Sequence, residues 1–354
     1  MNLGIYCETL SPALLDDPGI LDLLGSHEVT LACAVRFAEE DGCFDPGRIA
    51  SYLELGEKLK ERGGRMALWP LLPKSKGYWI NEKNLGYASR MADALCEGCR
   101  RFGAKPDLVI ADVETPWPQM ESVFLPVGPA ALKPFSAVKM YLQNRSPRRF
   151  SWAVKRLSEI VSRLRAEIAP VSAATFGLLV ADLVQNGHML QDFLEMPIFP
   201  VQFDAYNVMF YNSYLPHAVP FIMPPPSAPR ALYEYMSECV SRFSQKAWVT
   251  LGSTWEGVIP GNEGKSYTHP SQLEADAAAA KAAGVENIWL YCLEGVLYSD
   301  QKLTQRRSIE ESDAFFKVLL ETPAKEPAPH PAWARGRKVL EFAVTDRLKR
   351  FYKP

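Results

Sequence analysis

The stretch Pro106-Asp107-Leu108-Val109-Ile110-Ala111-Asp112-Val113-Glu114-Thr115-Pro116 decides how the chain is interpreted. Its apolar run, bounded by prolines, predicts a buried strand over residues 108–113 that ends in two carboxylates. Because side chains alternate along a strand, Asp112 and Glu114 should share one face with Ile110. Two neighbouring acids repel, so one should keep its proton at neutral pH, as general acid catalysis requires. The alternative is a strand end whose acids face solvent.

Strand-like and helix-like segments alternate along most of the chain. The predicted strands cover residues 3–7, 29–37, 66–72, 108–113, 175–181, 203–211, 247–251 and 288–293. The predicted helices cover residues 12–24, 46–62, 84–102, 151–168, 188–194, 228–243, 271–283 and 309–320. This alternation predicts an α/β fold, a closed (β/α)8 TIM barrel over residues 1–321 that forms the catalytic domain. The rival is an open doubly wound sheet, but no glycine-rich phosphate loop follows the first strand.

Two further segments extend the predicted barrel. Residues 115–150, after the fourth strand, form a long loop rich in proline and aromatic residues that we expect to cap the mouth. Residues 322–331 are proline-rich and predict a stiff linker. Residues 332–354 predict a basic amphipathic helix. This C-terminal helix either packs back on the barrel or makes a weak contact with a membrane surface or a partner.

Composition bounds the class of protein. The 354 residues, 47% of them hydrophobic, allow a large core, and the net charge of −2 argues against a nucleic-acid partner. Seven scattered cysteines argue against a disulfide framework, and the chain as given begins without a leader-like segment, so we expect a cytoplasmic protein. The Cys96–Cys99 pair lacks a second pair, and the five histidines are not clustered, so no metal or cofactor is predicted.

Barrel active sites lie at the carboxyl ends of the strands. The polar and aromatic residues at the predicted strand ends are Glu8, Arg36, Trp69, Asp112, Glu114, Asp182, Tyr211, Asn212, Trp255, Glu256, Tyr291 and Glu294. Met209 and the cap residue Trp117 complete the set of candidates.

The fourth predicted strand resembles the signature of the family 18 glycoside hydrolases, D-x-x-D-x-D-x-E. Asp107, Asp112 and Glu114 fall on its first, third and fourth acidic positions, whereas Ile110 occupies the second. The sixth strand is similar to the family's Met-x-Tyr-Asp run, with Met209 and Tyr211 matching and Asn212 in place of the aspartate.

Two other strands depart further from family 18. Tyr291 takes the place of the usual tryptophan on the eighth strand, and residues 68–73 replace the Ser-x-Gly-Gly pattern of the third. The resemblance is therefore that of a distant relative.

The resemblance implies cleavage of a β-linked N-acetylhexosamine glycan, of chitin or peptidoglycan type. Glu114 would be the proton donor, Asp112 would orient the 2-acetamido group, and Tyr211 would bind its carbonyl oxygen in a substrate-assisted retaining reaction. The substrate-binding candidates are Asn212, Met209, Trp69, Trp117, Tyr291, Glu294, Trp255, Glu8 and Arg36.

Three alternatives stay open. The Asp112-Val113-Glu114 run also looks like the Asp-x-Glu of family 25 muramidases, although those carry an aspartate on the first strand, where this chain has Cys7-Glu8. The change at Ile110 favours a glycan-binding barrel without catalysis. A metal-dependent sugar isomerase is the third possibility.

Overall fold

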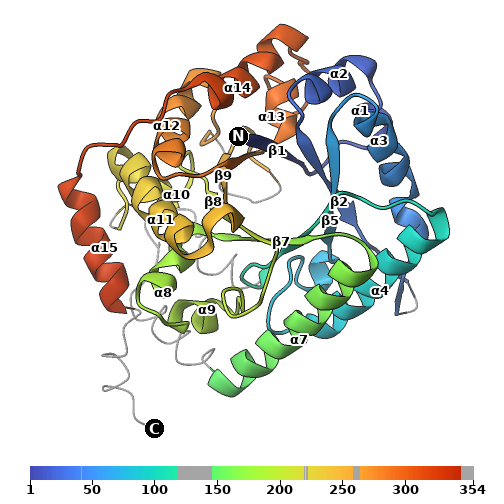
Figure 1. Ribbon diagram of the computed structural model, residues 1–354, viewed down its shortest axis with the longest axis horizontal. Coiled ribbons are helices and arrows are strands. Elements are labelled where there is room, and N and C mark those ends of the chain that lie inside the picture. The colour runs from blue at the N-terminus through green and yellow to red at the C-terminus, as the bar shows by residue number, and fades with distance from the viewer. Residues whose placement is uncertain (41, 118–145, 219, 221, 258–263, 344–354) are drawn as a thin grey trace.

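A computed structural model describes residues 1–40, 42–117, 146–218, 220, 222–257 and 264–343. Parallel strands form one closed barrel in the order β1-β10-β9-β8-β7-β6-β5-β2, with β2 pairing back to β1 (Figure 1). These strands are β1 (Asn2–Cys7), β2 (Thr30–Arg36), β5 (Arg65–Leu71), β6 (Leu108–Asp112), β7 (Val171–Phe176), β8 (Ala205–Phe210), β9 (Ala247–Gly252) and β10 (Asn287–Tyr291). The predicted (β/α)8 TIM barrel is confirmed.

Helices surround the barrel (Figure 1). They are α1 (Pro12–Leu15), α2 (Pro18–Ser26), α3 (Ala50–Lys60), α4 (Leu85–Phe102), α7 (Pro147–Glu167), α8 (Val180–Val184), α9 (Met189–Leu194), α10 (Leu215–Ala218), α11 (Ala228–Phe243), α12 (Glu274–Ala282), α13 (Leu293–Leu297), α14 (Ile309–Glu321) and α15 (Pro331–Ala343). Two short antiparallel strands, β3 (Glu39–Glu40) and β4 (Cys43–Phe44), follow β2.

Strand alternation separates the barrel interior from the layer under the helices. Ile110 packs inside the barrel with Trp69 and Trp289, whereas Val109 and Val113 pack outward against the helices. The predicted face of the fourth strand is therefore confirmed. It directs Asp112, the last residue of β6, toward the barrel axis at the carboxyl end, where barrel enzymes place their chemistry.

Several predicted boundaries were wrong. The helix predicted over 151–168 begins at Pro147, so the predicted cap of 115–150 extends too far, and the strand predicted over 288–293 ends at Tyr291. The fifth strand is Val171–Phe176 and not 175–181, because Gly177–Leu179 forms a 3₁₀ turn that leads into α8. A short apolar run is compatible with either a strand or a buried helix. The first predicted helix is two helices, because Asp17 caps a new helix that begins at Pro18.

The C-terminal helix α15 packs on the barrel beside α8 and α11 (Figure 1). Trp333 is buried, its indole ring lies edge-on to Tyr235 at 5.2 Å, and its Nε1–H donates to Glu234 at 2.8 Å. The part of the predicted helix after Ala343 lies outside the described residues. Among the helices that are described, none is long and apolar enough to cross a membrane. All seven cysteines fall within the described residues and are free thiols.

Candidate active site

Asp112 and Glu114 lie side by side at the carboxyl end of β6, and both are buried. Asp112 Oδ1 and Glu114 Oε2 have no hydrogen-bond donor among the residues that the structure describes. A proton held on one carboxyl and donated to the other satisfies both oxygens. Burial, followed by the charge of Asp112, raises the pKa of Glu114 well above its ordinary value, so this carboxyl holds the proton.

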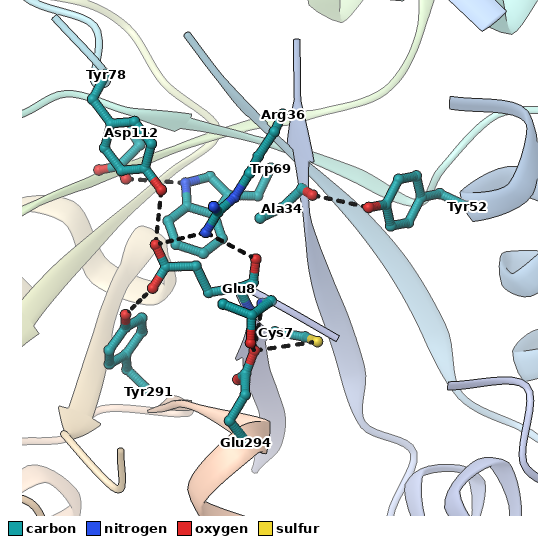
Figure 2. Close-up of polar contacts among 11 residues, drawn as sticks. Cys7, Glu8, Ala34, Arg36, Tyr52, Trp69, Tyr78, Asp112, Tyr291 and Glu294 are labelled. Atoms are coloured by element: carbon teal, nitrogen blue, oxygen red, sulfur yellow. Dashed lines mark hydrogen bonds and ion pairs between the residues drawn. The ribbon is translucent and has the colours of Figure 1, made fainter. Parts of the chain in front are cut away.

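The pKa of Asp112 is also raised, mainly by burial, and two of its neighbours oppose this rise. The hydrogen bond with Glu114 lowers it, as does the indole of Trp69, whose Nε1–H donates to Asp112 Oδ2 at 3.0 Å (Figure 2). The pair therefore combines one protonated acid with one carboxyl that ionises more readily, which is the arrangement needed to donate a proton and stabilise developing positive charge.

A third carboxyl, Glu8, points into the same centre from the end of β1. Its oxygens accept hydrogen bonds from Tyr78, at 2.8 Å, and from Tyr291 (Figure 2). Arg36 Nη2 approaches the same carboxyl at 3.4 Å. Burial raises the pKa of Glu8 against these hydrogen bonds. Its charge in turn raises the pKa of Asp112. The three carboxyls therefore form one electrostatic unit.

Tyr211 faces the carboxyl pair from the end of β8. Its ring stacks on Tyr291 with centroids 5.2 Å apart, and its hydroxyl lies 3.0 Å from the sulfur of Met209. Burial, then the charges of its acidic neighbours, including Glu114 and Asp112, raises the pKa of Tyr211, so the phenol stays a neutral donor. The structure thus brings the three predicted catalytic residues together.

Aromatic residues wall the site beside β5 and β6. Trp117 packs against Trp79 at 5.2 Å and against Tyr78 at 5.7 Å, with Lys74 Nζ 4.5 Å from its ring. Trp255 is also nearly buried with this interior cluster. Most of the predicted cap, residues 118–145, lies outside the described residues.

Some predicted site residues bond elsewhere. Asn212 does not face the carboxyls but donates to Asp276 on α12 at 2.7 Å, because that buried carboxyl needs a donor. Glu294 accepts the backbone N–H groups of Glu8 at 2.7 Å and Thr9 at 2.5 Å, so it positions the loop after β1 instead of a substrate.

Two more acids that were predicted at strand ends hold loops, and Asp182 lies in α8. Asp182 accepts the backbone N–H groups of Leu190 and Gln191 at the start of α9, because this helix end lacks intrahelical partners. Glu256 accepts the backbone N–H of Gly264 at 2.8 Å.

Sequence reasoning missed two tyrosines of the site. Tyr78 donates to Glu8, and Tyr6 lies inside the barrel, where it accepts from Asn207 at 2.9 Å and packs edge-on to Trp69 at 5.0 Å. Strand parity carries a signal for Tyr6, because it shares the inward face of β1 with Glu8. Tyr78 lies on a loop that no periodicity describes.

Solved glycoside hydrolases share this fold. A β-glucosidase from Exiguobacterium marinum is similar with a TM-score of 0.55 at 13% identity, over 92% of this chain and 98% of that enzyme. The exo-β-1,4-mannosidase Op5Man5 from Opitutaceae bacterium strain TAV5 gives 0.52 at 15% identity over 98% of this chain, which spans 60% of the mannosidase's length. A GH5 xyloglucanase from Bacteroides ovatus, in complex with an XXXG heptasaccharide, gives a TM-score of 0.52 at 12% identity. The match covers 90% of this chain and 75% of the xyloglucanase.

At these identities the likeness shows the barrel fold. No protein-family model matches the chain, and no curated protein matches it in sequence. None of the three enzymes named is described as a family 18 hydrolase, so the family 18 resemblance rests on the motif residues alone.

Proposed function

We propose that this chain hydrolyses a glycosidic bond, with Glu114 as the general acid and Asp112 as its partner carboxylate. The observation that carries the proposal is the buried pair at the end of β6, in which burial and the charge of Asp112 raise the pKa of Glu114 and favour its protonated form. A carboxyl that stays protonated at neutral pH is the group that acetal cleavage needs at the leaving oxygen. The fold shared with solved glycosidases supports a glycan as the substrate.

The finer proposal is substrate-assisted cleavage of a β-linked N-acetylhexosamine. Asp112, held by Trp69, accepts the N–H of the 2-acetamido group, and the amide oxygen attacks the anomeric carbon while Glu114 protonates the leaving oxygen. Tyr211 donates to the amide oxygen. Water then attacks the anomeric carbon of the oxazolinium-like intermediate and gives a proton to the Glu114 carboxylate. This opens the ring and regenerates the acid.

A second candidate is a muramidase-like hydrolase in which Glu8 takes a direct part. The observation that favours it is the position of Glu8, a buried carboxyl directly after β1 that accepts hydrogen bonds from two tyrosines and whose charge raises the pKa of Asp112. In that case Glu8 supplies the nucleophile or stabilises the positive charge at the anomeric carbon. The sugar then needs no acetamido group.

The test is a panel of aryl glycosides and oligosaccharides of N-acetylglucosamine and glucose. Wild type is compared with Glu114→Gln and with Glu54→Gln, which changes an exposed carboxyl on α3. Glu114→Gln should lower turnover roughly 10²–10⁴-fold on substrates with poor leaving groups, while Glu54→Gln leaves it unchanged. Oligosaccharide binding without turnover by wild type would instead assign a glycan-binding barrel without catalysis.

A further inference from the structure

A separate cavity opens beside the carboxyl centre, between the loops that follow β1 and β2. Its volume is about 500 Å³, which is large enough for a sugar residue. The polar residues that line it include Glu8, Thr9, Ser11, Arg36, Arg48 and Tyr52. Glu8 belongs both to this cavity and to the carboxyl centre, so the two spaces adjoin.

Two guanidinium groups line this cavity with donors to spare. Arg48 makes no side-chain hydrogen bond or ion pair with any residue that the structure describes. Arg36 is 45% exposed, and both of its contacts, to the carbonyl and the carboxyl of Glu8, use Nη2 at 3.3 and 3.4 Å. These distances are at the long end for hydrogen bonds, so Glu8 binds the Arg36 guanidinium only weakly.

Glu8 offsets only part of the positive charge at this cavity. Its carboxyl already accepts from two tyrosines, and the contacts of Glu8 with Arg36 are long, at 3.3 Å to its carbonyl and 3.4 Å to its carboxyl. Burial raises the pKa of Tyr52 to about 12, and the charges of Arg36 and Arg48 oppose that rise, so both guanidinium groups lie near its phenol. Among the described residues that line the cavity, Glu8 is the single acidic one, whereas Arg36 and Arg48 are cationic, so this lining has an excess of positive charge.

The walls of the cavity are fixed before any ligand arrives. Tyr52 on α3 donates to the carbonyl of Ala34 on β2 at 3.2 Å (Figure 2). Glu294 holds the backbone N–H groups of Glu8 and Thr9. A preformed cavity with unused guanidinium donors suits a small anionic group, since the guanidinium fork matches the two oxygens of a carboxylate or sulfate.

We infer that this cavity is a subsite for an anionic sugar residue, carboxylated or sulfated, with Arg36 and Arg48 as the ligands of its charge. The inference deepens the proposed function and rests on it for the neighbouring sugar at the carboxyl centre. It assigns the substrate class as an acidic glycan.

The experiment measures sugar binding by calorimetry to the Glu114→Gln protein, in which turnover should be strongly reduced. N-acetylmuramic acid and N-acetylglucosamine 6-sulfate are compared with N-acetylglucosamine, and glucuronic acid with glucose. An acidic sugar should bind about tenfold or more tightly than its neutral counterpart, and this preference should shrink when salt is raised tenfold. Comparing the sulfated sugar with the two carboxylated sugars shows which anionic group the cavity prefers.

Arg48→Gln and Arg36→Gln, added singly, should each remove most of this preference. The matched control is Arg101→Gln at the far end of α4, which should retain it. The subsite would be ruled out if the Glu114→Gln protein bound acidic and neutral sugars equally. It would also be ruled out if the arginine variants lost affinity equally for both kinds of sugar. If neutral glycosides are still hydrolysed, the proposed function survives that result. Acidic-sugar binding in a protein that hydrolyses no glycoside would support the subsite and overturn the proposed function.

Discussion

The indole Nε1–H of Trp69 donates a 3.0 Å hydrogen bond to Oδ2 of Asp112, from β5 to the neighbouring strand β6. Trp69 was predicted to bind substrate, but in the structure its polar atom holds a carboxyl of the proposed catalytic pair. Because this donor favours the ionised form of Asp112, it opposes the effect of burial on that pKa. Trp69 is therefore a positioning residue.

Trp69→Phe should raise the pKa of Asp112 further, because the ionised carboxyl loses its donor. We expect kcat to fall about tenfold and the acidic limb of the pH–rate profile to move up by about one pH unit. Trp152→Phe, at an exposed tryptophan on α7, is the control. A fall in rate with an unmoved acidic limb would mean that Trp69 acts on the substrate instead.

Glu8→Gln should move the same limb in the opposite direction. The charge of Glu8 raises the pKa of Asp112 and Glu114, so its removal should shift the acidic limb to lower pH. Under substrate assistance, turnover should stay within about tenfold of wild type, since the protein supplies no nucleophile. A loss of roughly 10⁴-fold on every substrate would assign the nucleophile to Glu8.

The alternation of side chains along a strand made it possible to predict which face carries the carboxyl pair. The placement of Asp112 and Glu114 on the same face as Ile110 follows from this alternation. The barrel fold follows from the alternation of strands and helices along the chain. The apolar run at 175–181 was misassigned because length and hydrophobicity do not separate a strand from a buried helix.

Contacts between distant residues were not predictable. Asn212 bonds to a carboxyl 64 residues away, and Glu294 holds a loop 286 residues away, so neither partner is visible from a motif. For the same reason, the sequence left open whether α15 packs on the barrel or contacts a membrane or partner. The hydrogen bond that holds it joins Trp333 to Glu234, which is 99 residues away in the sequence.

Trp333→Ala should destabilise the protein by about 3–5 kcal/mol, because it removes a buried indole and leaves Glu234 without that donor. Val339→Ala, at a position 59% exposed on the same helix, should cost less than about 0.5 kcal/mol. Urea unfolding and limited proteolysis of both variants check this. Equal stability of the two variants would mean that α15 contributes nothing to the barrel and is free for another contact.

Glu82 should make stability fall as pH rises. Its side chain is buried against Arg149 Nε at 2.7 Å, one of its oxygens lacks a donor among the described residues, and burial raises its pKa to about 7. The folded state therefore binds a proton that the unfolded chain releases near pH ~4.5. This stabilisation is complete below that pH and is lost as pH rises through about 7.

Glu82→Gln mimics the protonated side chain, so it isolates this effect. Between about pH 5 and pH 8, wild type should lose about 1 kcal/mol of unfolding free energy relative to Glu82→Gln, after allowance for solvent screening. Urea unfolding at both pH values measures the difference, with Glu54→Gln as the control. A difference that stays constant with pH would show that Arg149 keeps Glu82 ionised throughout.

Tyr211→Phe tests whether the substrate supplies its own nucleophile. The phenol is a neutral donor held between Tyr291 and Met209, and the proposed mechanism aims it at the acetamido oxygen. Its loss should weaken binding of a thiazoline analogue by about 1–3 kcal/mol, because a buried acceptor loses its donor. Tyr87→Phe, on α4, is the matched control.

The same mechanism requires an N-acetyl group on the reactive sugar. Glycosides with a 2-hydroxyl or a free 2-amino group should bind but react very slowly in wild type, because the nucleophile is missing from the substrate. Tyr211→Phe should therefore lower turnover of N-acetyl substrates and leave the residual rate on 2-hydroxy substrates unchanged. Hydrolysis of a glucoside as fast as its N-acetyl counterpart would rule out substrate assistance. The nucleophile would then have to come from the protein, and Glu8 is the buried carboxyl placed to supply it.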